Sequence, residues 1–269
     1  MNKFSKFLKN SLKSQDESIK AYQCDGHAKV WLKKATERHS IWIYLPLKWT
    51  AKILQIKALT PIPNHGGAAA IQCEVKRIQD LQDLGIPTAN ILAVNNQGLL
   101  LEDAGQVGAH VMQLDHALAM LKDDSERKLE FFEEAVLAIQ DIHLKKSYLS
   151  EAFARNILVN KNKEFTFIDF ETDPGHVLDV ETCQIRDWLC FIFSTAYRFT
   201  EEELKRACQI FINVVFPYRK IFKGVKSIGW KLRWAKKFRF EKLGSDGKRI
   251  QKCLLFFHYL EDQEPLPMI

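Results

Sequence analysis

The stretch from Ser150 to Glu171, SEAFARNILVNKNKEFTFIDFE, restricts the fold of this 269-residue chain more than any other segment. It contains two short apolar runs of strand character around the turn NKNKE, and it follows a long segment with helical spacing. Asn156 begins the first run, Asp169 ends the second, and Glu151 stands five residues before the amide. Because strands joined by a tight turn lie side by side, we expect Asn156 and Asp169 to meet at one end of a hairpin.

This pair of side chains predicts a magnesium site. Mg²⁺ prefers oxygen ligands, takes few protein carboxylates and completes its coordination shell with phosphate oxygens. The alternative is structural: Asn156 caps a turn, and Asp169 is a surface residue that ends the hairpin.

The first hundred residues alternate between strand and helix patterns. Two extended runs flank Asp25-Gly26, which is a hairpin signal. The segment 68–84 repeats apolar residues on one helical face and is closed by Gly85 and Pro87. A second hairpin follows, with its turn at NNQG. The pattern predicts a small α+β unit.

From residue 109 onward the patterns are mainly helical. We expect helices over 109–122, over 125–146 with Ser125 as the N-cap, and over 183–197. The length suits one large domain or two lobes that share a cleft.

Composition excludes several classes of protein. The six cysteines form no CxxC pair and have no ligand spacing with histidine, so they indicate neither a zinc site nor a disulfide framework, and we expect buried thiols in a reducing compartment. No apolar run approaches the roughly 20 residues of a membrane span, and the N-terminus lacks the apolar core of a signal peptide. These features predict a cytoplasmic protein.

Two charged residues upstream suggest a nucleotide site. The strand-like run VWLKK places Lys33 near its end, and Glu74 lies in the first half of the predicted helix 68–84. A strand lysine held by a helix glutamate can place an ammonium group on the α- and β-phosphates of a nucleotide. Either residue alone would be ordinary surface charge.

With these motifs in view, the chain resembles the protein-kinase-like fold, and within it the lipopolysaccharide kinase family of Gram-negative bacteria, which phosphorylates Kdo or heptose of the inner core. The resemblance covers about residues 20 to 200. It implies a bilobal α+β fold with a small N-lobe (21–104) and a larger C-lobe (105–269) that ends in basic helices. Separately, the helical spacing of apolar residues in 1–20 predicts an amphipathic helix before the N-lobe.

The resemblance also implies roles in the N-lobe. Lys33 takes the place of the phosphate-binding lysine, with Lys34 as the alternative register, and Glu74 takes the place of its partner glutamate. Glu102 to Ala104, in LLLEDAG, correspond to the hinge segment whose backbone contacts adenine. ATP is the expected nucleotide.

In the C-lobe, SEAFARN resembles the catalytic loop and IDFE the metal-binding motif. Asn156 and Asp169 then hold Mg²⁺, Glu151 stands where the family has the catalytic aspartate, and Asp187 corresponds to an aspartate that hydrogen-bonds the catalytic-loop backbone. Only eighteen residues separate Asp169 from Asp187, which favours a sugar or glycolipid acceptor over a peptide.

Two departures from the kinase pattern leave alternatives open. Glu151 has one methylene more than aspartate, and Gly26 is the one glycine near the first strands, where a glycine-rich loop would let backbone N–H groups approach phosphates. A catalytically impaired relative that acts as a membrane-surface scaffold is therefore one alternative, and an atypical protein kinase is another.

Basic charge is concentrated in residues 219–252. This segment has thirteen Lys and Arg residues against two acids, so its charge of +11 leaves −5 for the rest of a chain whose net charge is +6. Its interleaved aromatic residues allow three interpretations: a solvated helix with a buried aromatic stripe, a patch for anionic lipid or phosphorylated glycolipid, or a nucleic-acid surface, which we consider unlikely because no recognition motif accompanies it. The helix expected at 1–20 either packs on the domain edge or anchors at a membrane interface, and peripheral association with the inner face of the inner membrane would account for both segments.

Overall fold

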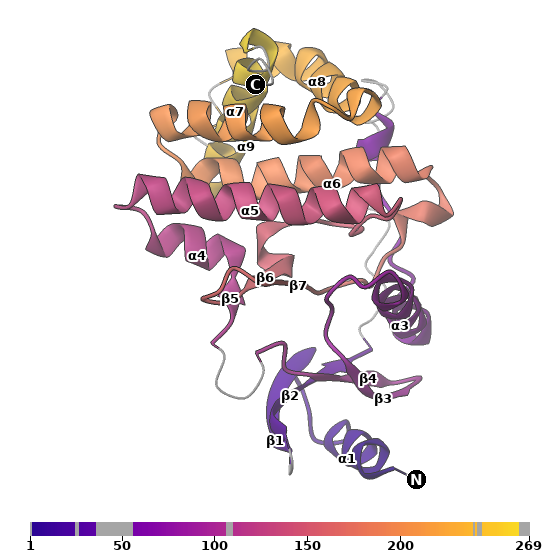
Figure 1. Ribbon diagram of the computed structural model, residues 1–269. Helices are drawn as coiled ribbons and strands as arrows, with labels where there is room; N and C mark the ends of the chain where they lie inside the picture. Colours follow the sequence, from indigo (N-terminus) through magenta and orange to yellow (C-terminus); the bar gives the residue numbers. More distant parts are fainter. Residues whose placement is uncertain are drawn as a thin grey trace.

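The computed structural model describes residues 2–24, 27–35, 56–105, 110–238, 240 and 244–263. These residues form a mixed α+β structure with small antiparallel sheets, and helices predominate. Figure 1 shows a four-stranded sheet at one end of the molecule and a larger helical part at the other.

The sheet end is built from the N-terminal elements. They are α1 (Lys3–Ser11), β1 (Ile19–Cys24), β2 (His27–Lys34), α3 (Gly67–Asp83), β3 (Ile91–Asn95) and β4 (Gly98–Glu102). The strand order is β1-β2-β4-β3, and every neighbouring pair is antiparallel. Both predicted hairpins are confirmed, although the turn at Asp25-Gly26 lies outside the described residues.

Helix α1 packs on this sheet. Leu8 of α1 and Leu12, which follows the helix, are buried together with Val30 and Leu32, which point to one face of β2. The apolar side of α1 is therefore used in packing, so the interpretation as a helix on the domain edge is confirmed and the interfacial anchor is wrong.

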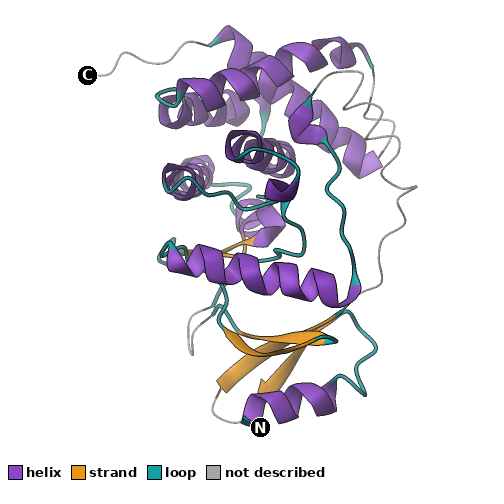
Figure 2. Ribbon diagram, turned by 90° about the vertical axis from the view of Figure 1, so that its right-hand side faces the viewer, coloured by secondary structure: helices purple, strands orange, loops and turns teal. Residues whose placement is uncertain are grey.

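Helix α3 crosses between the sheet and the helical part (Figures 1 and 2). Its residues Ile71, Ile78 and Leu81 belong to the main core, which continues into the larger part. The helix ends as predicted, because Gly85 adopts a positive φ of 67° that residues with side chains rarely tolerate. After α3 the chain contacts the larger part, where Pro87 O accepts a hydrogen bond from Phe167 N.

The larger part contains the remaining elements. They are β5 (Met112–Gln113), α4 (Leu114–Met120), α5 (Ser125–Leu144), β6 (Ile157–Val159), β7 (Phe165–Phe167), α6 (Val180–Thr195), α7 (Glu201–Val215), α8 (Arg219–Leu232) and α9 (Gly244–Asp262). Strands β5, β6 and β7 form a small antiparallel sheet.

Two local predictions here are wrong. The helix expected over 109–122 is limited to α4, because Met112 and Gln113 pair with β6 as a short strand. The N-cap of α5 is Asp124 and not Ser125, since the Asp124 side chain accepts a hydrogen bond from Arg127 N.

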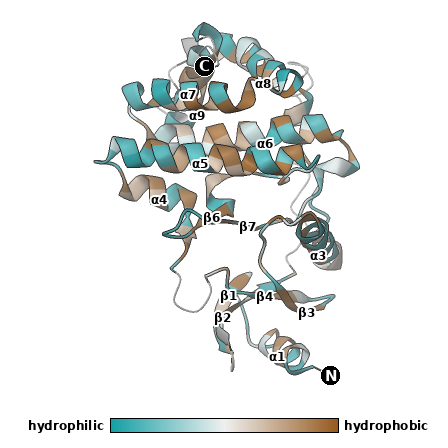
Figure 3. Ribbon diagram, viewed as in Figure 1, coloured by the Kyte–Doolittle hydropathy of each residue, from teal (hydrophilic) through white to brown (hydrophobic). Residues whose placement is uncertain are grey.

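Aromatic side chains bind the helices of the larger part together. Phe132 of α5 stacks on Phe191 of α6 at 5.3 Å, and Trp188 of α6 meets Phe211 of α7 edge to face at 5.1 Å. Figure 3 shows hydrophobic and hydrophilic residues in turn along these helices, as in helices with one buried side. All six cysteines are free thiols, and four of them are buried as expected, whereas Cys73 and Cys253 are partly exposed. Among the described residues, no helix has the length and apolar character to cross a bilayer.

Candidate functional site

Lys33 is the centre of the candidate site. Alternation along β2 turns Val30 and Leu32 toward α1, and so directs Lys33 to the opposite face, toward α3. There its Nζ lies 2.9 Å from Glu74 Oε2 and 3.0 Å from Glu74 Oε1. Glu74 is almost completely buried, so the predicted pairing of strand lysine with helix glutamate is present. Lys34 points the other way and donates to Gln15 O, so it takes no part in this cluster.

Two further carboxylates approach the same ammonium from the segment after β7. Asp169 Oδ1 and Glu171 Oε1 each lie 2.9 Å from Lys33 Nζ. Phe170 between them is buried in the main core, so it anchors the turn while its neighbours face Lys33. Asn64 adds a second contact, because its Nδ2 donates to Glu171 Oε2 at 2.9 Å. The sequence did not lead us to Glu171, although an acid two residues after Asp169 was the available signal.

The charges in this cluster do not balance. One ammonium faces three carboxylates, which leaves an excess of two negative charges when all are ionised. Burial would lower the pKa of Lys33, but Glu74, Asp169 and Glu171 outweigh it and raise that pKa above its ordinary value. Burial also raises the pKa of Glu74, and Lys33 opposes this effect only in part. The cluster therefore favours the approach of additional positive charge.

Backbone strain marks the same region. Asp169 has a φ of 73° and Ser150, directly before Glu151, has a φ of 75°. Such left-handed conformations cost about 1–3 kcal/mol for residues with a side chain, and they are frequent at functional sites. Asp169 is itself a predicted site residue, and Ser150 is the neighbour of Glu151, which is another.

Asn156 lies beside the end of β7. Its backbone O accepts from Ile168 N at 3.0 Å, which places the backbone of Asn156 beside the residue that precedes Asp169. The side chain is 6% exposed, and its Nδ2 donates to Glu151 O at 3.2 Å. This contact orients the amide so that Oδ1 remains available as an acceptor or metal ligand.

Glu151 is held by an arginine that the sequence did not single out. Arg186 of α6 donates from Nη2 to Glu151 Oε1 at 3.2 Å, and from Nη1 to Ala58 O and Thr60 O at 3.0 and 3.1 Å. The guanidinium thus joins the predicted acceptor-side carboxylate to the 56–60 segment that precedes α3. In the sequence, the position of Arg186 next to Asp187 was the one signal that could have pointed to it.

Asp187 contacts the backbone directly before the predicted catalytic loop. The carboxylate is fully buried, and its Oδ2 accepts from Leu149 N at 2.7 Å and lies 3.2 Å from His143 Nε2. It therefore fixes the chain two residues before Glu151.

No protein-family model and no curated protein matches this chain. The resemblance to the lipopolysaccharide kinases rests on motif spacing, and it stays a prediction.

The expected hinge segment lies at the end of β4, on the same sheet as Lys33. Glu102 N donates to Asn90 O, and the Glu102 carboxylate accepts from Asn90 Nδ2 at 2.9 Å, so this side chain is directed toward Asn90. Its neighbour Asp103 accepts from the indole N–H of Trp31 at 2.6 Å. Trp31 stands two residues before Lys33 and so shares its face of β2, which makes it an aromatic surface between the hinge segment and the lysine.

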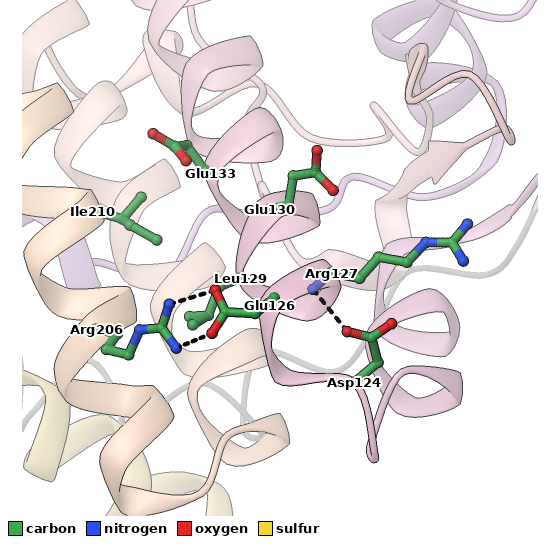
Figure 4. Close-up of a pocket in the computed structure, with 8 residues that line it drawn as sticks. All are labelled: Asp124, Glu126, Arg127, Leu129, Glu130, Glu133, Arg206 and Ile210. Carbon is green, nitrogen blue, oxygen red and sulfur yellow. Dashed lines mark hydrogen bonds and ion pairs between the residues drawn. The ribbon is translucent and has the colours of Figure 1, made fainter.

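A surface pocket elsewhere does not involve these residues. It lies between α5 and α7 (Figure 4), and Arg206 crosses it to pair with Glu126 at 2.5 and 2.7 Å. No predicted site residue lines it. In the part of the chain that the structure describes, no three His, Cys, Asp or Glu side chains are gathered as a ready metal site.

Proposed function

We propose that the chain is an ATP-dependent phosphotransferase with a bilobal kinase-like fold, acting on a sugar hydroxyl of the lipopolysaccharide inner core. The observation that carries the proposal is the position of Lys33, which reaches Glu74 of α3 on one side and Asp169 and Glu171 of the larger part on the other. The two parts of the molecule correspond to the two lobes in this proposal.

Lys33 has the task of orienting phosphates. Its three ion pairs hold the ammonium at one point between the sheet and the larger part, and its raised pKa keeps it charged at neutral pH. A fixed ammonium next to transferring phosphates contributes through position and charge, which are the main sources of catalysis in phosphoryl transfer. Incoming phosphates compete with Asp169 and Glu171 for this ammonium.

The donor set fits Mg²⁺. The carboxylates of Asp169 and Glu171 and the amide oxygen of Asn156 are hard oxygen ligands, and the local excess of negative charge favours a divalent cation. These three residues would hold the ion together with phosphate oxygens. When bound, Mg²⁺ neutralises the charge that develops on the phosphates.

Glu151 has the task of receiving the acceptor proton. Its carboxylate is anchored by Arg186, and its backbone is fixed by Asn156 on one side and by the Leu149–Asp187 contact on the other. A glutamate held at three points can orient a hydroxyl and take its proton as the phosphate transfers. The short connection between Asp169 and Asp187 supports a sugar on a glycolipid as acceptor.

The test measures ATP binding with and without Mg²⁺, and phosphate transfer to purified lipid A-core. We expect Lys33→Ala and Asp169→Ala to abolish transfer and to weaken Mg-ATP binding at least tenfold. Lys34→Ala is the matched control, because it removes the same charge from the next position of β2 and should leave both readouts unchanged. Equal Mg-ATP affinity in the wild type and in both site variants would refute the proposal.

One observation favours the scaffold alternative: Lys33 is already saturated by three carboxylates. A scaffold of this kind would bind no ATP, or would bind it independently of metal and without turnover. The same experiment distinguishes the two functions.

A further inference from the structure

Three large aromatic side chains are exposed in one short segment of the larger part. Trp230 is 56% exposed, Trp234 49% and Phe238 56%. They lie at the end of α8 and along the 3-10 turn η6 (Arg233–Lys237) that follows it. Figure 1 places α8 at the opposite end of the molecule from the four-stranded sheet. Exposed apolar groups gathered in this way usually mark an interaction surface.

The core does not require these rings. The buried side of α8 is formed by Ile221, Phe222, Val225 and Ile228, which pack into the main core. Trp230 lies outside this buried set near the end of α8, and Trp234 follows in η6, and both side chains are exposed. The interpretation of this segment as a buried aromatic stripe is therefore wrong for Trp230, Trp234 and Phe238.

Cations surround the same surface. Arg219, Lys220, Lys223 and Arg233 are exposed. Arg233 stacks over the Trp230 ring, with its guanidinium carbon 4.8 Å from the centroid. Lys220 is ion-paired with Glu181 at the start of α6. Because this surface combines cations with indole rings, it offers both charge attraction and interfacial insertion.

We propose that α8 and η6 dock on the surface of an anionic lipid bilayer, with Trp230, Trp234 and Phe238 inserted at the headgroup level. Indole rings favour the boundary between water and hydrocarbon, and basic side chains are attracted to anionic headgroups. A nucleic acid could match the charge and stack its bases on the rings, but no nucleic-acid recognition motif accompanies this segment, so DNA binding is kept as an outcome of the test. Helix α1 is excluded from this role, since its apolar side is packed on the sheet.

Binding to vesicles can be tested separately from phosphotransfer, because the assay contains no nucleotide. Purified full-length protein is floated with vesicles of phosphatidylcholine alone or mixed with phosphatidylglycerol. We expect binding only to the mixed vesicles, and weaker binding as salt is raised, because ions screen the attraction.

Two variants and their controls test the surface itself. The triple variant Trp230→Ser, Trp234→Ser, Phe238→Ser should lose at least tenfold in partitioning. The matched control Met120→Ser, Leu137→Ser, Leu144→Ser also removes three exposed apolar residues but should bind like the wild type. Lys223→Gln with Arg233→Gln should lose about fivefold for each charge, whereas Lys122→Gln with Lys161→Gln should lose little.

Fluorescence gives a readout that does not depend on flotation. Lipids brominated near the headgroup should quench tryptophan emission in the wild type and not in the triple variant. Equal melting temperatures show that the variants are folded. Three outcomes overturn the proposal: no binding to mixed vesicles, equal loss in the triple variant and its control, or retention of a salt-sensitive complex with DNA in the absence of vesicle binding.

Discussion

The buried carboxylate of Glu203 should control how the helical part of the protein responds to acid. This residue lies in the first turn of α7 and is 5% exposed. It accepts from Ser125 Oγ at 2.5 Å, from Lys128 Nζ at 2.9 and 3.1 Å and from Thr200 N at 2.8 Å. All four hydrogen bonds favour the ionised form.

These contacts determine the size of the effect. Burial would raise the pKa of Glu203, but the hydrogen bonds from Ser125, Thr200 and Lys128 outweigh it and lower the pKa from 4.5 to about 2. Because the folded pKa is below the unfolded one, this contribution is fully present above about pH 4.5 and is lost as the pH falls toward 2. The shift corresponds to about 3 kcal/mol in total, of which about 2 kcal/mol is lost by about pH 3.

The perturbation is Glu203→Gln, followed by urea unfolding from neutral pH down to about pH 3. At neutral pH we expect a loss of about 3–5 kcal/mol, because Lys128 is left as a buried charge without its partner. The variant should then lose about 2 kcal/mol less than the wild type on acidification. Glu202→Gln is the control, since that neighbouring side chain is 79% exposed and should change stability by less than about 0.5 kcal/mol.

The result that refutes this reasoning is a wild type and a Glu203→Gln variant that lose the same free energy of unfolding between about pH 5 and pH 3. The double variant Lys128→Met, Glu203→Gln separates the two contributions. It should recover most of the neutral-pH loss and keep the shallow acid response.

Three further predictions concern the site and its support. Trp31→Ala should weaken ATP binding about tenfold, since stacking of a base on an aromatic ring is worth about 1–3 kcal/mol. Binding of inorganic triphosphate, which has no base, should not change. Titration calorimetry measures both affinities, and an equal loss for the two ligands would contradict the prediction. Arg186→Met should lower the rate of phosphate transfer about 10²-fold through misplacement of Glu151, with ATP affinity unchanged, as steady-state kinetics would show. Gly229→Ala should cost about 1–3 kcal/mol in thermal unfolding, because a Cβ there would lie 2.9 Å from Phe257 Cβ, which cannot move without the backbone of α9, and unchanged stability would contradict this.

Local patterns were sufficient for the elements that bring the site together. The hairpin turns, the periodicity of α3 and the alternation of β2 depend on neighbouring residues, so these elements could be anticipated. The proximity of Asn156 to the end of β7 followed in the same way from one tight turn. The pairing of Lys33 with Glu74 was expected from the arrangement of kinases and not from local pattern.

The errors and omissions have tertiary causes. Met112 is a strand residue because β6 offers it a pairing edge, which the helical spacing around it does not reveal. Two adjacent residues, Asp124 and Ser125, can each cap a helix, and the choice depends on where the preceding backbone turns. Arg186 and Glu151 are thirty-five residues apart, so only the packing of α6 against the loop brings them into contact.

Helix α6 connects the two proposals of this work and also separates their tests. Consecutive residues of this helix serve different partners: Ile185 lies against Gly224 of α8, Arg186 holds Glu151, and Asp187 holds the Leu149 backbone. A change in the α6–α8 contact can therefore displace the candidate site even if membrane binding has no part in catalysis. Substitutions confined to the exposed rings of α8 and η6 avoid this coupling, because they leave the buried face of α8 intact. The triple aromatic variant can therefore be assayed with two acceptors. If it keeps its activity on a water-soluble acceptor but loses phosphotransfer to the glycolipid, the loss comes from the missing lipid contact.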